Sequence, residues 1–333
     1  MPPIGSRNLI PPASPSKKKI LRAGIAGPPR CCSGGAPTLQ QDMPKRDSDL
    51  AGFDILAPTD QTVPLVVASP HSGSIYPDDL VDAAQLDCRS LRRSEDCFVD
   101  ELFGDAAGCG IPLIRALFPR AYIDVNREPW ELDPAMFEDD LPAWVNRNSP
   151  RVACGLGTIA RVVSEGVPIY RRKLRFDEAE SRVEQLYKPY HAALRLLVDE
   201  TRSRYGVSLL IDAHSMPSMQ RLRNGVNGSG LADFVLGDRN GTSCDPALVD
   251  AAESLLRKAG YRVARNQPYA GGYTTVIHGL PKEGRHCLQI EINRALYMNE
   301  RDFERISGFP QIRETIGNLL RGLSAAVISL KKE

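Results

Sequence analysis

Several patterns that reveal a function class are missing from this sequence of 333 residues. No run approaches the roughly 18 apolar residues that a membrane-spanning helix needs, which argues against a membrane protein. The eight cysteines are scattered and none forms C-x-x-C, so we expect reduced thiols in a cytoplasmic protein rather than a disulfide framework or a four-cysteine zinc knot. The motifs G-x-x-x-x-G-K-[ST], H-E-x-x-H and G-x-S-x-G are absent as well.

Acidic residues are absent from positions 1–41, which carry six basic residues. The whole chain has 42 basic and 41 acidic side chains, so residues 42–333 hold 36 basic against 41 acidic groups, a net charge of −5. Nonspecific nucleic-acid binding needs clustered positive charge, which a mildly acidic body lacks. We therefore expect neither nucleic acid nor a membrane as a partner.

The first 45 residues also contain nine of the 26 prolines. Pro, Gly and Ser interrupt them every few positions, so little apolar area can be buried to offset chain entropy. A targeting peptide is the alternative, but there is no apolar signal core, and the prolines oppose the amphipathic helix of a transit peptide. We predict a disordered basic leader over residues 1–45 and one large folded domain over residues 46–333.

In this domain, short apolar runs bounded by turn residues alternate with helical patterns, which predicts an α/β fold. We expect a three-layer sandwich with a central mixed sheet of about eight strands between helices. Strands are predicted over 63–69, 111–117, 121–125, 207–212, 233–237, 261–264, 273–277 and 286–292. Helices are predicted over 94–107, 176–204, 246–259 and 300–330, with Pro189 kinking or splitting the second of them.

Polar side chains directly follow several predicted strands. Open α/β sheets build their sites beyond the carboxyl ends of strands, so these side chains are expected to lie together. They belong to the segments Pro70-His71-Ser72-Gly73, Asp124-Val125-Asn126-Arg127-Glu128, Ala213-His214-Ser215 and Asn293-Arg294. They supply two histidines, several carboxylates and two arginines.

Two histidines and one carboxylate around an open fourth position form the usual hydrolytic zinc site. His71 and His214 are the candidate histidine ligands, because each lies just past an apolar strand. The common His-x-x-Glu spacing fails because Ser74 occupies that position, so the acidic candidates nearest to His71 on a defined element are Glu95 and Asp96.

Glu291 is a charged residue within the apolar run Leu288-Gln289-Ile290-Glu291-Ile292. A buried carboxylate is costly, so it usually has a functional or paired reason to exist. It fits the general base of a metal-dependent hydrolase, and a salt bridge to Arg294 or Arg285 is the structural alternative.

Six motifs in this order closely resemble the N-formylglutamate amidohydrolase family: Pro70-His71-Ser72-Gly73, Asp124-Val125-Asn126-Arg127, Ile169-Tyr170-Arg171-Arg172, Lys188-Pro189-Tyr190-His191, Asp212-Ala213-His214-Ser215 and Leu288-Gln289-Ile290-Glu291. The resemblance covers roughly residues 53–325 and implies a fold and a site like those of zinc carboxypeptidases and aspartoacylases. It implies one Zn²⁺ held by His71, Asp96 and His214, with Glu291 as general base. Glu95 remains the alternative to Asp96, because Ser94 stands where the family often has another Asp.

The resemblance implies that residues 46–333 form one catalytic domain that hydrolyses N-formyl-L-glutamate to formate and L-glutamate, a late step of histidine degradation. A relative that acts on another N-acyl amino acid or a short peptide, and a metal-free binding protein on the same scaffold, stay open. The oligomeric state is left open too.

Arginines suit the two carboxylates of such a substrate, because a guanidinium binds a carboxylate through two parallel hydrogen bonds. Arg127 is expected to act in both catalysis and binding. The further candidates for substrate binding are Asn126, Tyr170, Arg171, Arg172 and Arg294. His278 and His286 are interpreted as structural, and Gly271-Gly272-Tyr273 as a mobile loop near the mouth of the site.

Overall fold

The computed structural model describes residues 52–163, 166–218 and 232–330. The leader predicted over residues 1–45 lies outside the described residues. Among the residues that the structure describes, none of the helices combines the length and the apolar character of a membrane span.

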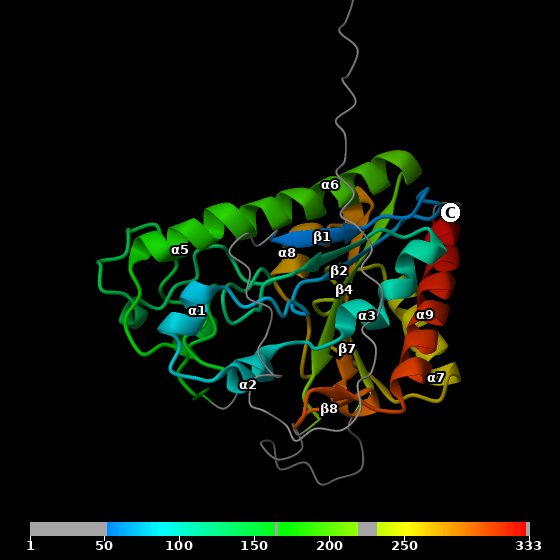
Figure 1. Ribbon diagram of the computed structural model, residues 1–333. Helices are drawn as coiled ribbons and strands as arrows, with labels where there is room; N and C mark the ends of the chain where they lie inside the picture. Colours follow the sequence, from blue (N-terminus) through cyan, green and yellow to red (C-terminus); the bar gives the residue numbers. More distant parts are fainter. Residues whose placement is uncertain (1–51, 164–165, 219–231, 331–333) are drawn as a thin grey trace, which may run out of the picture. The chain divides into compact units, whose positions relative to one another are not determined.

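Seven strands of the described residues form one mixed sheet in the order β1-β3-β2-β4-β7-β5-β6 (Figure 1). They are β1 (Phe53–Leu56), β2 (Leu65–Ser69), β3 (Leu113–Ala116), β4 (Ser208–Met216), β5 (Phe234–Gly237), β6 (Val263–Arg265) and β7 (Arg285–Asn293). The pairs β3–β2, β2–β4, β4–β7 and β5–β6 are parallel, while β1–β3 and β7–β5 are antiparallel. The predicted α/β fold is confirmed, with seven strands in the central sheet where about eight were expected.

The helices differ widely in length. They are α1 (Asp78–Ala83), α2 (Cys88–Leu91), α3 (Val99–Leu102), α4 (Pro150–Ala153), α5 (Phe176–Arg182), α6 (Lys188–Tyr205), α7 (Pro246–Lys258), α8 (Tyr273–His278) and α9 (Phe309–Leu330). A π-helical turn, Val183–Tyr187, joins α5 to α6. Pro189 lies just after this turn, in the first turn of α6. Tyr187 and Lys188 keep helical backbone angles, so the predicted 176–204 helix continues through the π turn and is not split at Pro189 (Figure 1).

Alternate residues of each central strand face opposite sides of the sheet. On one side, Leu209 and Ile211 of β4 and Leu288 of β7 belong to the core that α7 and α9 cover. On the other side, Leu210 and Cys287 belong to the core under α6 (Figure 1). The same alternation places Asp212, His214 and Glu291 on the α6 side of the sheet.

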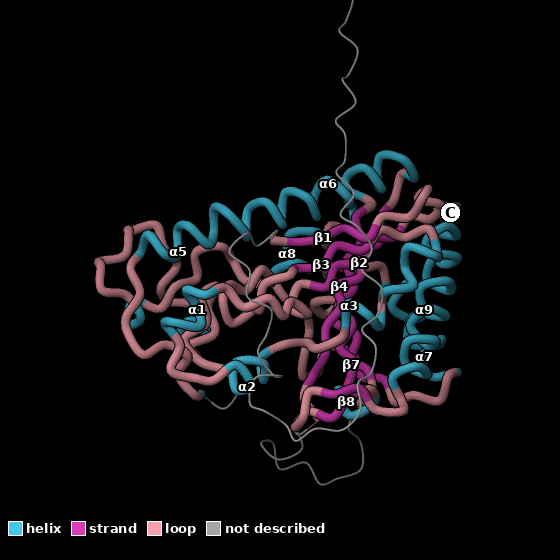
Figure 2. The backbone as a smooth tube through the Cα atoms, in the orientation of Figure 1, coloured by secondary structure: helices cyan, strands magenta, loops and turns pink. Residues whose placement is uncertain are grey.

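The prediction of a strand over residues 121–125 is wrong. This segment is a turn and loop, in which Tyr122 N donates to Pro119 O. Figure 2 shows that most of the chain between β3 and α5 is loop. The apolar side chains of this segment are buried without strand pairing, because they pack in the core under α6.

The predicted strand over residues 273–277 is also wrong, because these residues form the helix α8. Two threonines, a valine and an isoleucine favour a strand by propensity. The long-range contact with Asn126 outweighs that preference, since Thr274 N donates to Asn126 Oδ1 at 2.8 Å in the first turn of α8. The predicted mobile loop therefore runs directly into a helix.

Two predicted helices are shorter than expected. The range 94–107 contains α3, the end of the 3₁₀ turn Arg92–Ser94 and the first part of the 3₁₀ turn Gly104–Cys109. Residues 300–308 precede α9 and include β9 (Glu304–Arg305), which pairs with β8 (Met298–Asn299) in a separate hairpin.

Candidate metal centre

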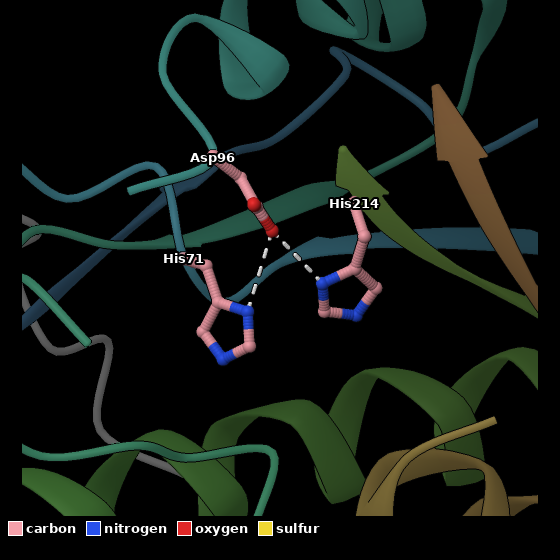
Figure 3. Close-up of side chains that lie close together, drawn as sticks. All are labelled: His71, Asp96 and His214. Atoms are coloured by element: carbon pink, nitrogen blue, oxygen red, sulfur yellow. Dashed lines mark hydrogen bonds and ion pairs between the residues drawn. The ribbon is translucent and has the colours of Figure 1, made fainter. Parts of the chain in front are cut away.

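Three buried side chains converge at the carboxyl ends of β2 and β4. His71 follows β2, His214 lies near the end of β4, and Asp96 comes from the loop before α3 (Figure 3). Asp96 Oδ2 is 3.4 Å from His71 Nδ1 and 3.1 Å from His214 Nδ1. One ligand atom from each residue lies within 4.8 Å of the other two. Two ligands of a tetrahedral zinc ion are about 3.3 Å apart, so this spacing suits a zinc ion.

The local backbone determines which acidic residue reaches the histidines. Asp96 N donates to His71 O at 3.0 Å, which ties the loop to the segment after β2. Glu95 points elsewhere, since its carboxylate accepts from Tyr76 Oη, from Arg92 Nε at 3.2 Å and from Cys97 Sγ at 3.0 Å. Neighbouring residues of an extended backbone face opposite sides, so only Asp96 lies with the histidines.

A carboxylate lies against the outer nitrogen of each histidine. His71 Nε2 is 2.7 Å from Asp124 Oδ1, and His214 Nε2 is 3.0 Å from Asp212 Oδ1. The Asp124 carboxylate favours the proton of His71 on Nε2, which leaves the lone pair of Nδ1 for a metal ion, and the Asp212 carboxylate acts on His214 in the same sense. His71 Nδ1 is buried and makes no hydrogen bond. An unpaired buried nitrogen that faces a carboxylate oxygen and a second imidazole has the donor chemistry of a metal ligand.

The electrostatics of the group also call for a cation. Burial raises the pKa of Asp96, but its hydrogen bond with His214, its close contact with His71 and the charge of Arg294 outweigh burial and hold that pKa well below its usual value. Burial lowers the pKa of His214, but the Asp212 and Asp96 carboxylates outweigh it and raise that pKa well above its usual value. Without a metal the group holds a proton, so binding of a divalent ion would release it.

Glu291 lies beside the group on the neighbouring strand. Its backbone is in register with that of His214 across the parallel β4–β7 pair, and its Oε1 accepts from Gln289 Nε2 at 2.8 Å. Burial, helped by the negative charges of Asp96 and Asp212, raises the pKa of Glu291 to about 7. The alternative salt bridges are not formed: Arg285 pairs with Glu283 and Asp199, and Arg294 pairs with Asp96.

Arg120 is a cation of this site that the sequence reasoning missed. Its Nη2 donates to Asp124 Oδ2 at 2.7 Å, and its charge also acts on the carboxyl groups of Asp96 and Glu291. Arg120 follows β3 by four residues. The rule that polar groups gather beyond strand ends would have found it.

Two of the expected substrate-binding residues lie at this site. Asn126 Nδ2 is 3.0 Å from His214 Nε2 and 3.2 Å from Asp212 Oδ2, while its Oδ1 accepts from Thr274 N. Both the nitrogen and the oxygen of the Asn126 amide are therefore hydrogen-bonded to other protein groups. Arg127 donates to Leu156 O and to Asn126 O, and its Nη2 is 3.7 Å from Asp124 Oδ2.

The other expected substrate-binding residues have different partners. Arg171 donates to Ala84 O, and Arg172 pairs with Glu178 at the surface, where its side chain is 47% exposed. Tyr170 Oη accepts from the buried Arg182 Nη1 at 2.9 Å. Arg294 donates to Asp96. Tyr170, Arg171 and Arg172 therefore contact other parts of the described chain, whereas Arg294 contacts the metal-binding group through Asp96.

Comparison with known proteins bears on the identity of this site. The family model of N-formylglutamate amidohydrolase matches residues 63–298, a range that contains His71, Asp96, His214 and Glu291. The chain belongs to the N-formylglutamate amidohydrolase family.

Relatives within this family are similar over most of the chain. The crystal structure of N-formylglutamate amidohydrolase from Ralstonia eutropha JMP134 is 41% identical, with a TM-score of 0.79, and the match covers 84% of this chain and 99% of that one. N-formylglutamate deformylase of Pseudomonas putida is 31% identical over 72% of this chain and 83% of its own length. The protein of the same name from Pseudomonas aeruginosa is 30% identical, with the same coverage.

Proposed function

We propose that this protein is a zinc-dependent amidohydrolase that hydrolyses N-formyl-L-glutamate to formate and L-glutamate in the cytoplasm, as a step of histidine degradation. Family membership and the names of its relatives support this substrate. The observation that carries the proposal is the convergence of His71 Nδ1, His214 Nδ1 and Asp96 Oδ2 beside the buried Glu291.

The residues of the site divide the reaction between them. A zinc ion bound by His71, Asp96 and His214 would polarise the formyl carbonyl and make a water molecule more acidic. Glu291 accepts a proton from the attacking water and passes it to the leaving amine of glutamate. We assign to Arg120, whose positive charge acts on the carboxyl groups of Asp96 and Glu291, the stabilisation of the oxygen that becomes negative in the tetrahedral intermediate.

The charge of the site fits an anionic substrate once a divalent cation is present. Among the described residues discussed above, four carboxylates at the site face three guanidinium groups: Asp96, Asp124, Asp212, Glu291, Arg120, Arg127 and Arg294. With all seven side chains charged and both histidines neutral, as metal ligands must be, these groups sum to −1, and a divalent ion changes the net charge to +1. A net positive charge at the site attracts a dianionic substrate.

The first test is metal content together with a substrate panel. We expect about one zinc per purified chain, loss of activity on chelation, and recovery when Zn²⁺ is returned. N-formyl-L-glutamate should have a kcat/KM about 10- to 200-fold above that of N-acetyl-L-glutamate, because one extra methyl-sized group on a substrate is worth roughly 1–3 kcal/mol. Turnover of N-acetyl substrates alone would contradict the proposed substrate. A protein with neither metal nor activity after zinc addition would indicate a binding protein instead.

Arg127 is the arginine that we assign to a substrate carboxylate, because its Nη2, 3.7 Å from Asp124 Oδ2, is not used in its hydrogen bonds to Leu156 O and Asn126 O. Replacing Arg127 by Met should raise KM for N-formyl-L-glutamate about 10- to 100-fold, since a charge-assisted hydrogen bond contributes about 1.5–3 kcal/mol. Replacement of Arg172 by Met is the matched control, because Arg172 pairs with Glu178 at the surface. Steady-state kinetics should show no change for the control. Equal KM values for the two variants would remove Arg127 from the substrate site.

A further inference from the structure

The two carboxylate oxygens of Asp96 lie in different surroundings. Oδ2 faces the Nδ1 atoms of His71 and His214 (Figure 3). Oδ1 accepts from Arg294 Nη2 at 2.9 Å and from Ser215 Oγ at 3.1 Å. One oxygen is thus directed at the candidate metal position, and the other is held by two donors.

Arg294 is fixed in this position from several sides. Its Nε donates to Ser215 Oγ at 3.0 Å and its Nη1 to Arg93 O at 3.4 Å. Arg294 lies in the 3₁₀ turn Arg294–Leu296, directly after β7, and is 7% exposed. Each guanidinium nitrogen therefore donates to a protein acceptor, which conflicts with the expected role of Arg294 in substrate binding.

The connection between Arg294 and Ser215 matters because Ser215 follows His214 in β4. Arg294 thus joins the end of β7 to the end of β4 and to the loop that carries Asp96. A buried guanidinium is costly unless it is paired and hydrogen-bonded, and here Asp96 supplies both conditions.

We propose that Arg294 is a positioning residue for the metal ligand Asp96: together with Ser215 it occupies Oδ1, so that the carboxylate presents Oδ2 alone to the metal ion. The inference rests on the metal site of the proposed function. Binding through one oxygen leaves the remaining positions around the ion for water and the substrate carbonyl.

The test is to replace Arg294 by Met and measure the zinc dissociation constant by competition with a chromophoric chelator. Loss of an outer-shell partner typically weakens metal binding about 10- to 100-fold, and we expect a change of that size. Replacing Ser215 by Ala removes one of the two donors and should give a smaller change in the same direction. Replacing Arg294 by Lys, which keeps a charge and a donor, should restore part of the affinity.

Arg182 provides the matched control, since it is also a buried arginine, at 2% exposure, and it donates to Tyr122 O and Tyr170 Oη. Replacing Arg182 by Met should lower thermal stability and leave zinc affinity unchanged. A common loss of affinity in both variants would show a general effect of removing a buried arginine and would overturn the inference.

The visible absorption spectrum of the Co²⁺-substituted protein reports on the coordination of the metal ion. It would not change if Arg294 only stabilised the fold. If the Arg294→Met change releases Oδ1, Asp96 can bind through both oxygens, and the visible absorption should weaken as the coordination number rises. An unchanged spectrum with unchanged zinc affinity, or tighter zinc binding, would overturn the inference. In that case the wild type would still bind zinc and the proposed function would stand. A wild type that binds no zinc would overturn both.

Discussion

Replacement of Glu291 by Gln should lower kcat by about 10³-fold while the zinc content stays at about one per chain. General acid–base catalysis typically increases the rate about 10²–10⁴-fold. In the proposed reaction Glu291 transfers two protons, one from water and one to the leaving amine. Gln has the same shape as Glu and retains an oxygen that can accept from Gln289 Nε2, so the strand pairing with β4 should be preserved. Steady-state kinetics and metal analysis on the same preparation measure both quantities.

Glu95 gives the matched control for this variant. It is also a buried carboxylate, at 1% exposure, but its partners are Tyr76, Arg92 and Cys97. Replacement of Glu95 by Gln should reduce thermal stability and leave kcat and zinc content close to the wild type. A large loss of zinc from this variant would show that Glu95 is a ligand after all. Retained turnover without Glu291 would show that another group is the base.

The pH dependence should identify the same residue. Burial raises the pKa of Glu291 to about 7 in the metal-free chain, and a nearby divalent cation lowers it. The base works only when it is deprotonated, so kcat/KM should fall as the pH falls through a range at or below about 7. The residual activity of the Glu291→Gln variant should lack this acid limb, because the amide does not titrate.

The core of the site was predictable because it depends on strand periodicity. A residue just past a buried parallel strand lies at one edge of the sheet whatever the loops do, and His71 and His214 both follow from that rule. Glu291 follows from the cost of a charge in an apolar strand. The choice between Glu95 and Asp96 did not follow, because it depends on which way one extended residue turns, and a hydrogen bond from Asp96 N to His71 O decides it.

The arginines show where sequence reasoning fails. Arg171 and Arg172 are adjacent and basic in a family motif, yet their side chains pair with Ala84 O and Glu178. Arginine has a long flexible side chain, so its position along the chain does not determine its partner. Arg120, which the sequence reasoning missed, is held by the same Asp124 that supports His71. Arg171 reaches a carbonyl 87 residues away, whereas Arg120 and Arg172 pair with carboxylates four and six residues further along the chain. A basic position in a motif therefore does not show whether its partner is local, distant or a substrate.

Replacement of His71 by Ala should reduce the zinc content to below about 0.1 per chain at micromolar protein and lower kcat/KM by about 10³-fold or more, because two protein ligands hold a zinc ion much less tightly than three. It also removes one of the two buried partners of Asp124 Oδ1 and leaves Asn126 N as the other, so some loss of stability is expected. His286 provides the control: it is 6% exposed, its Nδ1 accepts from Asp245 N at 3.2 Å, and strand alternation puts it on the face of β7 opposite to Glu291. Replacement of His286 by Ala should lower thermal stability by a similar amount but leave zinc at about one per chain. Full zinc content in the His71 variant, or equal zinc loss in both variants, would contradict the assignment of His71 as a metal ligand.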